Sequence, residues 1–192
     1  SSPKLIKKGY KVSHKIPLSD PYISSEDVMA VAKALEEKRL SQGEYVQRFE
    51  EEFARYINVK HAVAVCNGTA ALHVAVAAIG VKQRDEVIVP SFSFVSTANC
   101  VLYQGARPTF ADIDSLTYNI DPVDVERKIN NNTKAIIPVH YAGQPADMDS
   151  ICEIAEKHGA FVIEDAAEAH GALYKGRKSG SLGDMACFSF YP

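Results

Sequence analysis

Residues 161–170 read FVIEDAAEAH, and this stretch decides the fold. The run from Phe161 to Ile163 is wholly apolar, and it leads into the acidic pair Glu164 and Asp165 before small residues follow. A short continuous apolar run is typical of a strand buried on both faces of a parallel sheet. Ligands of α/β proteins bind beyond the carboxyl ends of such strands, so Asp165 lies where we expect chemistry.

Similar apolar runs recur along the chain and alternate with helical patterns. We expect strands at residues 62–66, 86–90, 108–113, 135–140, 161–164 and 186–190, and helices at residues 69–79, 95–103, 122–130 and 148–158. Two amphipathic helices are expected before them, at residues 24–39 and 43–57, the first behind a capping box at Ser24. This order predicts an α/β fold with a mainly parallel sheet sandwiched by helices.

Composition excludes several classes of function. The chain has 192 residues, of which 46% are hydrophobic and 23% charged, which is ordinary for a soluble globular protein. A net charge of -3 with scattered Lys and Arg leaves no basic surplus, so we expect no nucleic-acid partner. No apolar run approaches the ~20 residues that span a bilayer, and no signal-peptide pattern is present, so we expect a cytoplasmic protein without a membrane partner.

Four cysteines occur without a CxxC pair, and each lies in an apolar stretch. This pattern favours reduced core residues over a disulfide or zinc framework. We therefore predict no metal site.

The segment Asn67-Gly68-Thr69 follows an expected strand and opens a helix. Backbone N–H groups and a hydroxyl converge there, where the helix dipole favours an anion such as a phosphate. All three residue types also cap helices well, so a plain helix cap stays open as the alternative.

Asp165 gives a sharper signal. A carboxylate at the end of an apolar strand costs desolvation energy unless a cation or a hydrogen bond compensates it, and a protonated ring nitrogen would do so. Alternation along the strand predicts that Glu164 faces the opposite side. The alternative is a solvent-facing acidic loop that also includes Glu168.

Two aromatic residues and one serine are further candidates. Phe92 and Phe94 follow the strand at 86–90, where one ring could lie over a planar ligand, with core packing as the alternative. Ser189 is expected on the last strand, opposite in direction to Phe190, where it could cap a phosphate or bond to backbone.

Other motifs carry less weight. Residues 171–183 are glycine-rich but lack the Lys-Ser/Thr of a phosphate-binding loop, and we expect a hairpin or loop that carries Lys175, Arg177 and Lys178 into solvent. His140 and His170 lie just past expected strands, and a catalytic role is one interpretation of each. A structural histidine bonded to backbone is the favoured interpretation of each.

Five ordered motifs resemble the DegT/DnrJ/EryC1/StrS family of sugar aminotransferases. They are NGTAALH, DEVIVPSFSFVSTAN, TKAIIPVHYAGQPADMD, VIEDAAEAHGALYKGRKSGSLGD and CFSFYP. The resemblance runs over residues 18–192 and implies the large domain of the type I aspartate-aminotransferase fold. On this basis residues 1–17 are a tail, and the large domain is truncated, with the C-terminal small domain absent.

The resemblance implies that pyridoxal 5′-phosphate is the cofactor. Gly68 and Thr69 are similar to the family's phosphate-binding turn, and Ser189 is similar to the serine that contacts the phosphate.

Three more residues are similar to those around the cofactor ring. Phe94 matches the aromatic residue stacked on the ring, and Glu168 matches the residue beside the ring hydroxyl. Asp165 matches the catalytic partner of the ring nitrogen, which keeps the ring protonated and able to accept electrons.

The reaction implied by the resemblance is transfer of an amino group from glutamate to a nucleotide-linked keto-deoxy sugar, for surface polysaccharide or amino-sugar biosynthesis. Glu168 within DAAEAHGA is similar to perosamine-type synthases and favours amination at C4. The family works as a homodimer with a shared active site. Its Schiff-base lysine falls two residues beyond Pro192, so we expect an N-terminal fragment that is inactive alone.

Two alternatives within the same fold stay open. One is a pyridoxamine-phosphate-dependent sugar dehydratase, in which a histidine replaces the lysine. The other is a non-catalytic, cofactor-binding regulatory relative. The residue at the lysine position separates both from an aminotransferase.

Overall fold

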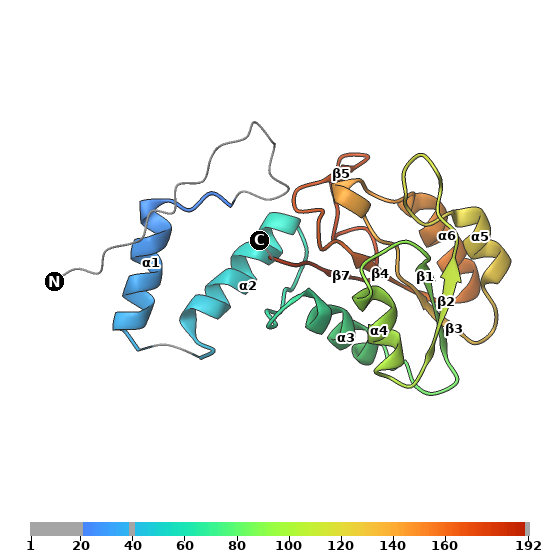
Figure 1. Ribbon diagram of the computed structural model, residues 1–192, viewed down its shortest axis with the longest axis horizontal. Coiled ribbons are helices and arrows are strands. Elements are labelled where there is room, and N and C mark those ends of the chain that lie inside the picture. The colour runs from blue at the N-terminus through green and yellow to red at the C-terminus, as the bar shows by residue number, and fades with distance from the viewer. Residues whose placement is uncertain (1–20, 39–40, 191–192) are drawn as a thin grey trace, which may run out of the picture. The chain divides into compact units, whose positions relative to one another are not determined.

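The computed structural model describes residues 21–38 and 41–190, which belong to two compact units (Figure 1). The described part of the first unit contains the helix α1 (Ser25–Glu36), and the second unit contains every other described element. The expected tail at 1–17 lies outside the described residues, as do Tyr191 and Pro192 of the last motif. The expected domain boundary after residue 17 therefore stays a prediction.

The capping box predicted for α1 is confirmed. The Ser24 hydroxyl accepts from the Asp27 N–H at 3.2 Å, and the Asp27 carboxylate accepts from the Ser24 N–H at 2.7 Å. Each contact satisfies an N–H group near the helix start that has no helical partner. The helix ends at Glu36, three residues before the expected end.

The second unit is built on a five-stranded sheet in the order β2-β1-β3-β4-β7, and every neighbouring pair is parallel. The strands are β1 (Glu86–Pro90), β2 (Arg107–Ala111), β3 (Thr133–Ile136), β4 (Phe161–Asp165) and β7 (Met185–Cys187). The helices are α2 (Glu44–Ile57), α3 (Gly68–Ala78), α4 (Ser96–Leu102), α5 (Pro122–Lys128) and α6 (Met148–His158). The predicted α/β fold with a mainly parallel sheet is confirmed.

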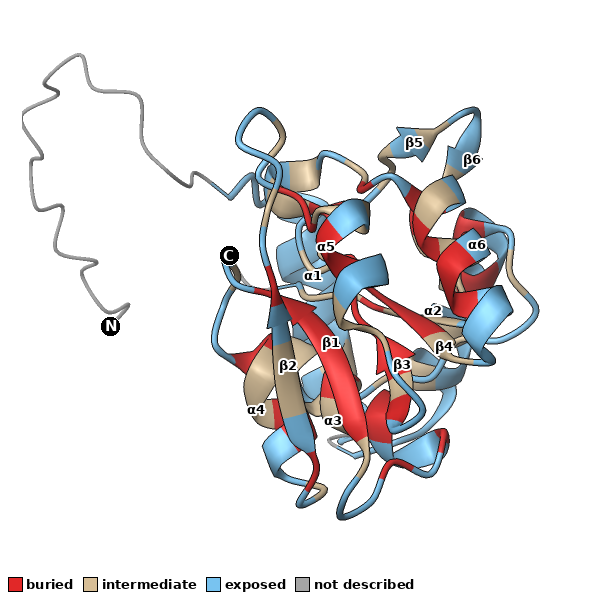
Figure 2. Ribbon diagram, turned by 90° about the vertical axis from the view of Figure 1, so that its right-hand side faces the viewer, coloured by how far each residue is buried: buried red, intermediate tan, exposed pale blue. Residues whose placement is uncertain are grey.

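Successive residues of the central strands face opposite helical layers. Val87 and Val89 join an apolar cluster with α3 and α4, whereas Ile88 between them joins a second cluster with α5 and α6. All three are fully buried, and each such side chain contributes about 1.5–3 kcal/mol by leaving water. Figure 2 shows β1 buried along its length, while β2 at the edge of the sheet is partly exposed. Helices therefore cover both faces of the sheet.

The prediction of a strand at residues 62–66 is wrong. The segment has no strand pairing among the described residues, and the Ala64 N–H donates instead to the Glu50 carboxylate of α2 at 2.8 Å. Its continuous apolar run is typical of a strand, but a strand forms only beside a partner. The last expected strand is also shorter than predicted, because β7 ends at Cys187.

The hairpin expected in the glycine-rich segment is present as β5 (Leu173–Tyr174) and β6 (Arg177–Lys178), which pair antiparallel. Lys175 and Arg177 are exposed, as expected. Lys178 is not directed into solvent, which corrects the prediction. Its ammonium lies 3.7 Å from the centroid of the Tyr56 ring and donates to the Tyr56 carbonyl, so the charge gains a cation–π contact and a hydrogen bond.

All four cysteines are free thiols. Cys100 and Cys187 are buried and Cys152 is partly buried, but Cys66 is exposed, contrary to the expected core position. Burial raises the pKa of Cys100 to about 12, so this thiol stays protonated. Among the described residues there is no cluster of three or more metal-ligating side chains and no helix long and apolar enough to cross a membrane.

Candidate active site

Asp165 ends β4 at the carboxyl edge of the sheet, and its side chain is buried. The residue is only 4% exposed, so the alternative of a solvent-facing acidic loop is wrong for Asp165. Its carboxylate accepts from the Thr97 hydroxyl at 2.7 Å and from the Ala167 N–H at 3.3 Å. Burial raises the pKa of Asp165, and these hydrogen bonds offset the effect only in part. A cation placed against this carboxylate would therefore be stabilised.

The first turn of α4 joins Asp165 to the start of α3. Thr97 donates to Asp165, and its hydroxyl oxygen lies 2.7 Å from that of Ser93, which must then be the donor to Thr97. The neighbouring Ser96 hydroxyl lies 2.7 Å from the hydroxyl of Thr69 in α3. Two hydrogen-bonded contacts from one helical turn thus hold the buried acid and the helix start in a fixed arrangement.

These hydroxyls were not predicted from the sequence. The prediction for PSFSFVSTAN used only its aromatic residues. Ser93, however, precedes Ser96 by three residues and Thr97 by four. That spacing is typical of side chains on one helix face and was the available signal.

Gly68 and Ser189 meet at the start of α3. A Cβ atom added at Gly68 would lie 2.9 Å from the Ser189 Cβ and 3.4 Å from its hydroxyl oxygen, so the two segments approach as closely as a glycine permits. The Asn67 side chain caps the helix by accepting from the Ala70 N–H at 2.8 Å, as the capping alternative expects for Asn67. No described residue accepts from the N–H groups of Gly68 and Thr69, which remain available to an anion.

Phe94 and Phe92 follow β1 at the same edge of the sheet. Phe94 is 75% exposed, and Phe92 is 44% exposed and packs against Tyr118 and Tyr141 with ring centroids 6.0 and 5.0 Å away. The alternative interpretation, that both phenylalanines are core residues, is therefore wrong. An exposed ring at this edge is available to a planar ligand, and stacking by Phe94 stays a prediction.

Glu168 is exposed and supports a neighbouring turn. Its carboxylate accepts from the Ala142 N–H at 2.9 Å, within the 3₁₀ turn η1 (Tyr141–Gly143). Ala142 has φ +51°, and a Cβ added at Gly143 would lie 3.1 Å from the Glu168 carbonyl oxygen. The contact predicted between Glu168 and a ring hydroxyl stays a prediction.

The two histidines occupy different environments. His140 is fully buried, and its Nδ1 accepts from the Ala146 N–H at 3.1 Å, which agrees with the structural interpretation. His170 has no such backbone bond. It packs against the rings of Phe188 and Phe190, with centroids 5.2 and 4.9 Å away, and burial lowers its pKa. Among the described contacts of both residues, nothing supports a catalytic role.

The described chain thus brings a buried carboxylate and a helix start with unaccepted N–H groups to the carboxyl edge of a parallel α/β sheet, the architecture of a class of proteins that bind ligands at that edge. Within that class, the chain belongs to the DegT/DnrJ/EryC1/StrS aminotransferase family, whose model matches residues 21–192. The resemblance predicted from the five motifs is confirmed.

Relatives of known name support this assignment. The chain is 50% identical over 181 residues to the spore coat polysaccharide biosynthesis protein SpsC of Bacillus subtilis, covering 94% of the chain and 46% of SpsC. It is 54% identical over 151 residues to the GDP-perosamine synthase of Caulobacter vibrioides, covering 79% of the chain and 41% of the synthase. The chain therefore spans less than half the length of these relatives.

A solved structure shows the same architecture. The putative sugar aminotransferase Spr1654 from Streptococcus pneumoniae, in its PLP-form, matches with a TM-score of 0.86 and 30% identity. The match covers 92% of the chain and 49% of that structure. The described chain therefore has the architecture of about half of this putative sugar aminotransferase.

Proposed function

We propose that these residues belong to a pyridoxal-phosphate-dependent aminotransferase that transfers an amino group from glutamate to a nucleotide-linked keto-deoxy sugar. The observation that carries the proposal is the pair of contacts from the first turn of α4, Ser96 to Thr69 and Thr97 to Asp165, each at 2.7 Å. They hold an anion-binding helix start and a buried acid together. A cofactor with a phosphate at one end and a protonated ring nitrogen at the other needs both.

The start of α3 fits the phosphate. The N–H groups of Gly68 and Thr69 have no acceptor among the described residues, and the helix dipole adds a favourable field. The close approach of Ser189 to Gly68 would bring a hydroxyl to the same phosphate. Gly68 has to lack a side chain for this approach, because a Cβ there would overlap with Ser189.

The end of β4 fits the ring. Asp165 would pair with the ring nitrogen and favour a proton there, because the ion pair relieves the desolvation cost of the buried carboxylate. Phe94 would cover a face of the ring, and Glu168 would lie beside its hydroxyl. The cofactor, when bound, supplies an electron-withdrawing heterocycle that stabilises negative charge at the reacting carbon.

The remaining assignments are proposals that rest on the resemblance to the family. Amination at C4 is supported by the similarity to GDP-perosamine synthase and by Glu168 within DAAEAHGA. We propose that a lysine two residues beyond Pro192 forms the Schiff base and moves protons, and that a homodimer in the cytoplasm completes the site. A histidine at the lysine position would indicate the dehydratase instead, and an inert residue the regulatory relative.

An absorbance experiment on the full-length protein tests the reaction. The protein is loaded with pyridoxal phosphate and mixed with glutamate. We expect the visible band of the bound cofactor to fall and the near-ultraviolet band of pyridoxamine phosphate to rise, and a nucleotide-linked 4-keto-deoxy sugar then to restore the visible band. An unchanged spectrum with glutamate would contradict the proposal.

A further inference from the structure

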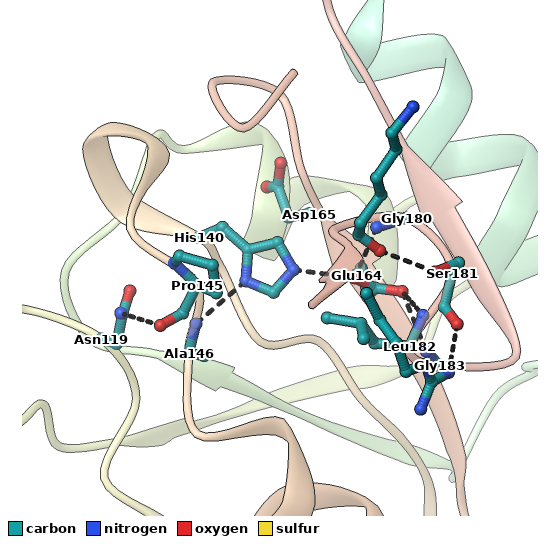
Figure 3. A network of polar contacts seen from close by, with 12 residues as sticks. Asn119, His140, Pro145, Ala146, Glu164, Asp165, Gly180, Ser181, Leu182 and Gly183 are labelled. Carbon is teal, nitrogen blue, oxygen red and sulfur yellow. Dashed lines mark hydrogen bonds and ion pairs between the residues drawn. The ribbon is translucent and has the colours of Figure 1, made fainter. Parts of the chain in front are cut away.

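Glu164 is a fully buried carboxylate on the strand that carries Asp165, and its side chain lies on the opposite side of that strand (Figure 3). It accepts four hydrogen bonds, from His140 Nε2 at 2.8 Å and from the N–H groups of Gly180, Leu182 and Gly183 at 2.7, 2.7 and 2.8 Å. Burial opposes ionisation, yet these hydrogen bonds hold the pKa of Glu164 below its ordinary value. The protein thus keeps a charge inside its core.

The hydrogen bonds of His140 define how its ring contacts Glu164. Nδ1 accepts from the Ala146 N–H at 3.1 Å, so this nitrogen carries no hydrogen and the ring hydrogen lies on Nε2. Nε2 therefore donates to Glu164. With both ring nitrogens engaged, residue 140 is fixed in place. Its own N–H donates to the Asp165 carbonyl at 3.0 Å, which ties it to the end of β4.

The turn that follows His140 contacts the second predicted cofactor carboxylate. The Ala142 N–H donates to Glu168 at 2.9 Å, and the adjacent Tyr141 N–H donates to the Asn119 side chain at 3.0 Å. The left-handed backbone of Ala142, at φ +51°, is strained for a residue other than glycine and persists only when its surroundings hold it. His140 and the buried Asn119 together anchor this turn to the core.

We propose that Glu164 is a positioning residue of the active site. Through His140 it fixes the main chain of Asp165 and the turn that supports Glu168. Through the N–H groups of residues 180–183 it fixes the segment that enters β7 and leads to Ser189. The inference rests on the proposed function, because Asp165, Glu168 and Ser189 are the residues assigned there to the cofactor.

Hydrogen exchange in the cofactor-free full-length protein tests the coupling. Glu164→Gln keeps the size of the side chain, but it removes the charge and turns an NH₂ group toward groups that are themselves donors. We expect the amides of residues 141–143 and 180–183 to exchange at least about tenfold faster, and those of α3 to be unchanged. Glu153→Gln is the matched control, because Glu153 is exposed on α6 and pairs with Lys157 at the surface.

A second variant separates positioning from simple stabilisation. His140→Asn can still accept from Ala146 but cannot reach Glu164, so we expect faster exchange at residues 141–143 even if Glu164→Gln fails to fold. Residues 180–183 should change little in this variant, because Glu164 keeps its bonds to their N–H groups. In the loaded enzyme, both variants should shift the absorbance band of the bound cofactor and lower kcat more than they raise KM for glutamate. A structural residue alone would lower stability without moving that band.

Two results would overturn the inference. The first is unchanged exchange at residues 141–143 in both variants, and the second is faster exchange that is uniform across α3 and β1. Exchange is measured without cofactor, so its outcome does not depend on cofactor binding. A wild-type protein that fails to bind pyridoxal phosphate would contradict the proposed function, whereas normal binding with unchanged exchange would contradict only the role of Glu164.

Discussion

At the scale of single residues, Asp165 carries the chemistry assigned to the site. Asp165→Asn keeps the shape and can still accept from Thr97, but it removes the negative charge that holds a proton on the ring nitrogen. We expect kcat of the full-length enzyme to fall by at least about a hundredfold, with the fold intact. Steady-state kinetics and circular dichroism measure the two properties.

Asp149→Asn is the control for this change, because Asp149 is an exposed carboxylate on α6 that pairs with Lys175. Its kcat should stay within about twofold of wild type, as usual for a surface charge remote from the site. Equal activity of Asp165→Asn and wild type would remove the assigned role.

Gly68 is the second residue of the proposed site at which we expect a substitution to impair cofactor binding. In Gly68→Ala the new methyl group would overlap with Ser189, whose Cβ lies 2.9 Å from the added atom. Moving the two segments apart should cost about 1–3 kcal/mol of unfolding free energy and weaken the affinity for pyridoxal phosphate. Urea unfolding and fluorescence titration of the cofactor test both effects.

Gly43→Ala is the matched glycine control, because a Cβ at Gly43 would meet nothing within 4 Å. It should leave cofactor affinity unchanged. If the two alanine variants bind the cofactor equally well, the close approach of Ser189 has no part in phosphate binding.

At the scale of elements, a buried carboxylate anchors α5 to the end of β2. Asp124 accepts from Lys128 at 2.8 Å and from the Asp112 N–H at 2.6 Å, and it also contacts Arg127. The hydrogen bond from Lys128 and that from Asp112 outweigh burial and lower the pKa of Asp124 to about 2.

This shift predicts a pH-dependent contribution to stability. The folded-state pKa of Asp124 is depressed below the ordinary aspartate value of 3.8, so the stabilisation by Asp124 is present above pH 3.8 and is lost as the pH falls toward 2. The difference in unfolding free energy between wild type and Asp124→Asn should therefore be largest near pH 7 and shrink below pH 4. Urea unfolding at several pH values measures it, and a difference that grows on acidification would contradict the assignment. Glu126→Gln, exposed on the same helix, is the control.

The elements with strong local signals were predicted well from the sequence. β1 and α6 have the expected bounds, because an apolar run between polar residues sets β1 and a regular apolar face ending at Gly159 sets α6. The segment at 62–66 shows where prediction from a local pattern fails. Its apolar run is as continuous as that of β1, but strand formation depends on a partner that no local pattern specifies.

The residues of the candidate site also differ in how well the sequence predicts them. Gly68 and Asp165 were identified because each ends or begins an element within a local motif. The contacts that join them were missed, because Thr69 and Ser96 lie 27 residues apart and Thr97 and Asp165 lie 68 apart. Only the order of strands in the sheet brings these residues together.

At the scale of the whole molecule, the described residues form a parallel α/β sheet covered by helices, within the DegT/DnrJ/EryC1/StrS aminotransferase family. The chain spans less than half the length of SpsC and GDP-perosamine synthase, so sugar recognition, the Schiff-base lysine and the partner subunit remain proposals. Asp165 and the start of α3, to which the proposal assigns the cofactor, both lie within the described chain. The central claim can therefore be tested at Asp165.

A crystal structure of the full-length protein with pyridoxal phosphate is the most direct test. We predict that the Asp165 carboxylate lies about 2.7–2.9 Å from the ring nitrogen, with the phosphate on the N–H groups of Gly68 and Thr69. A ring bound elsewhere, or a cofactor whose nitrogen faces away from Asp165, would contradict the account.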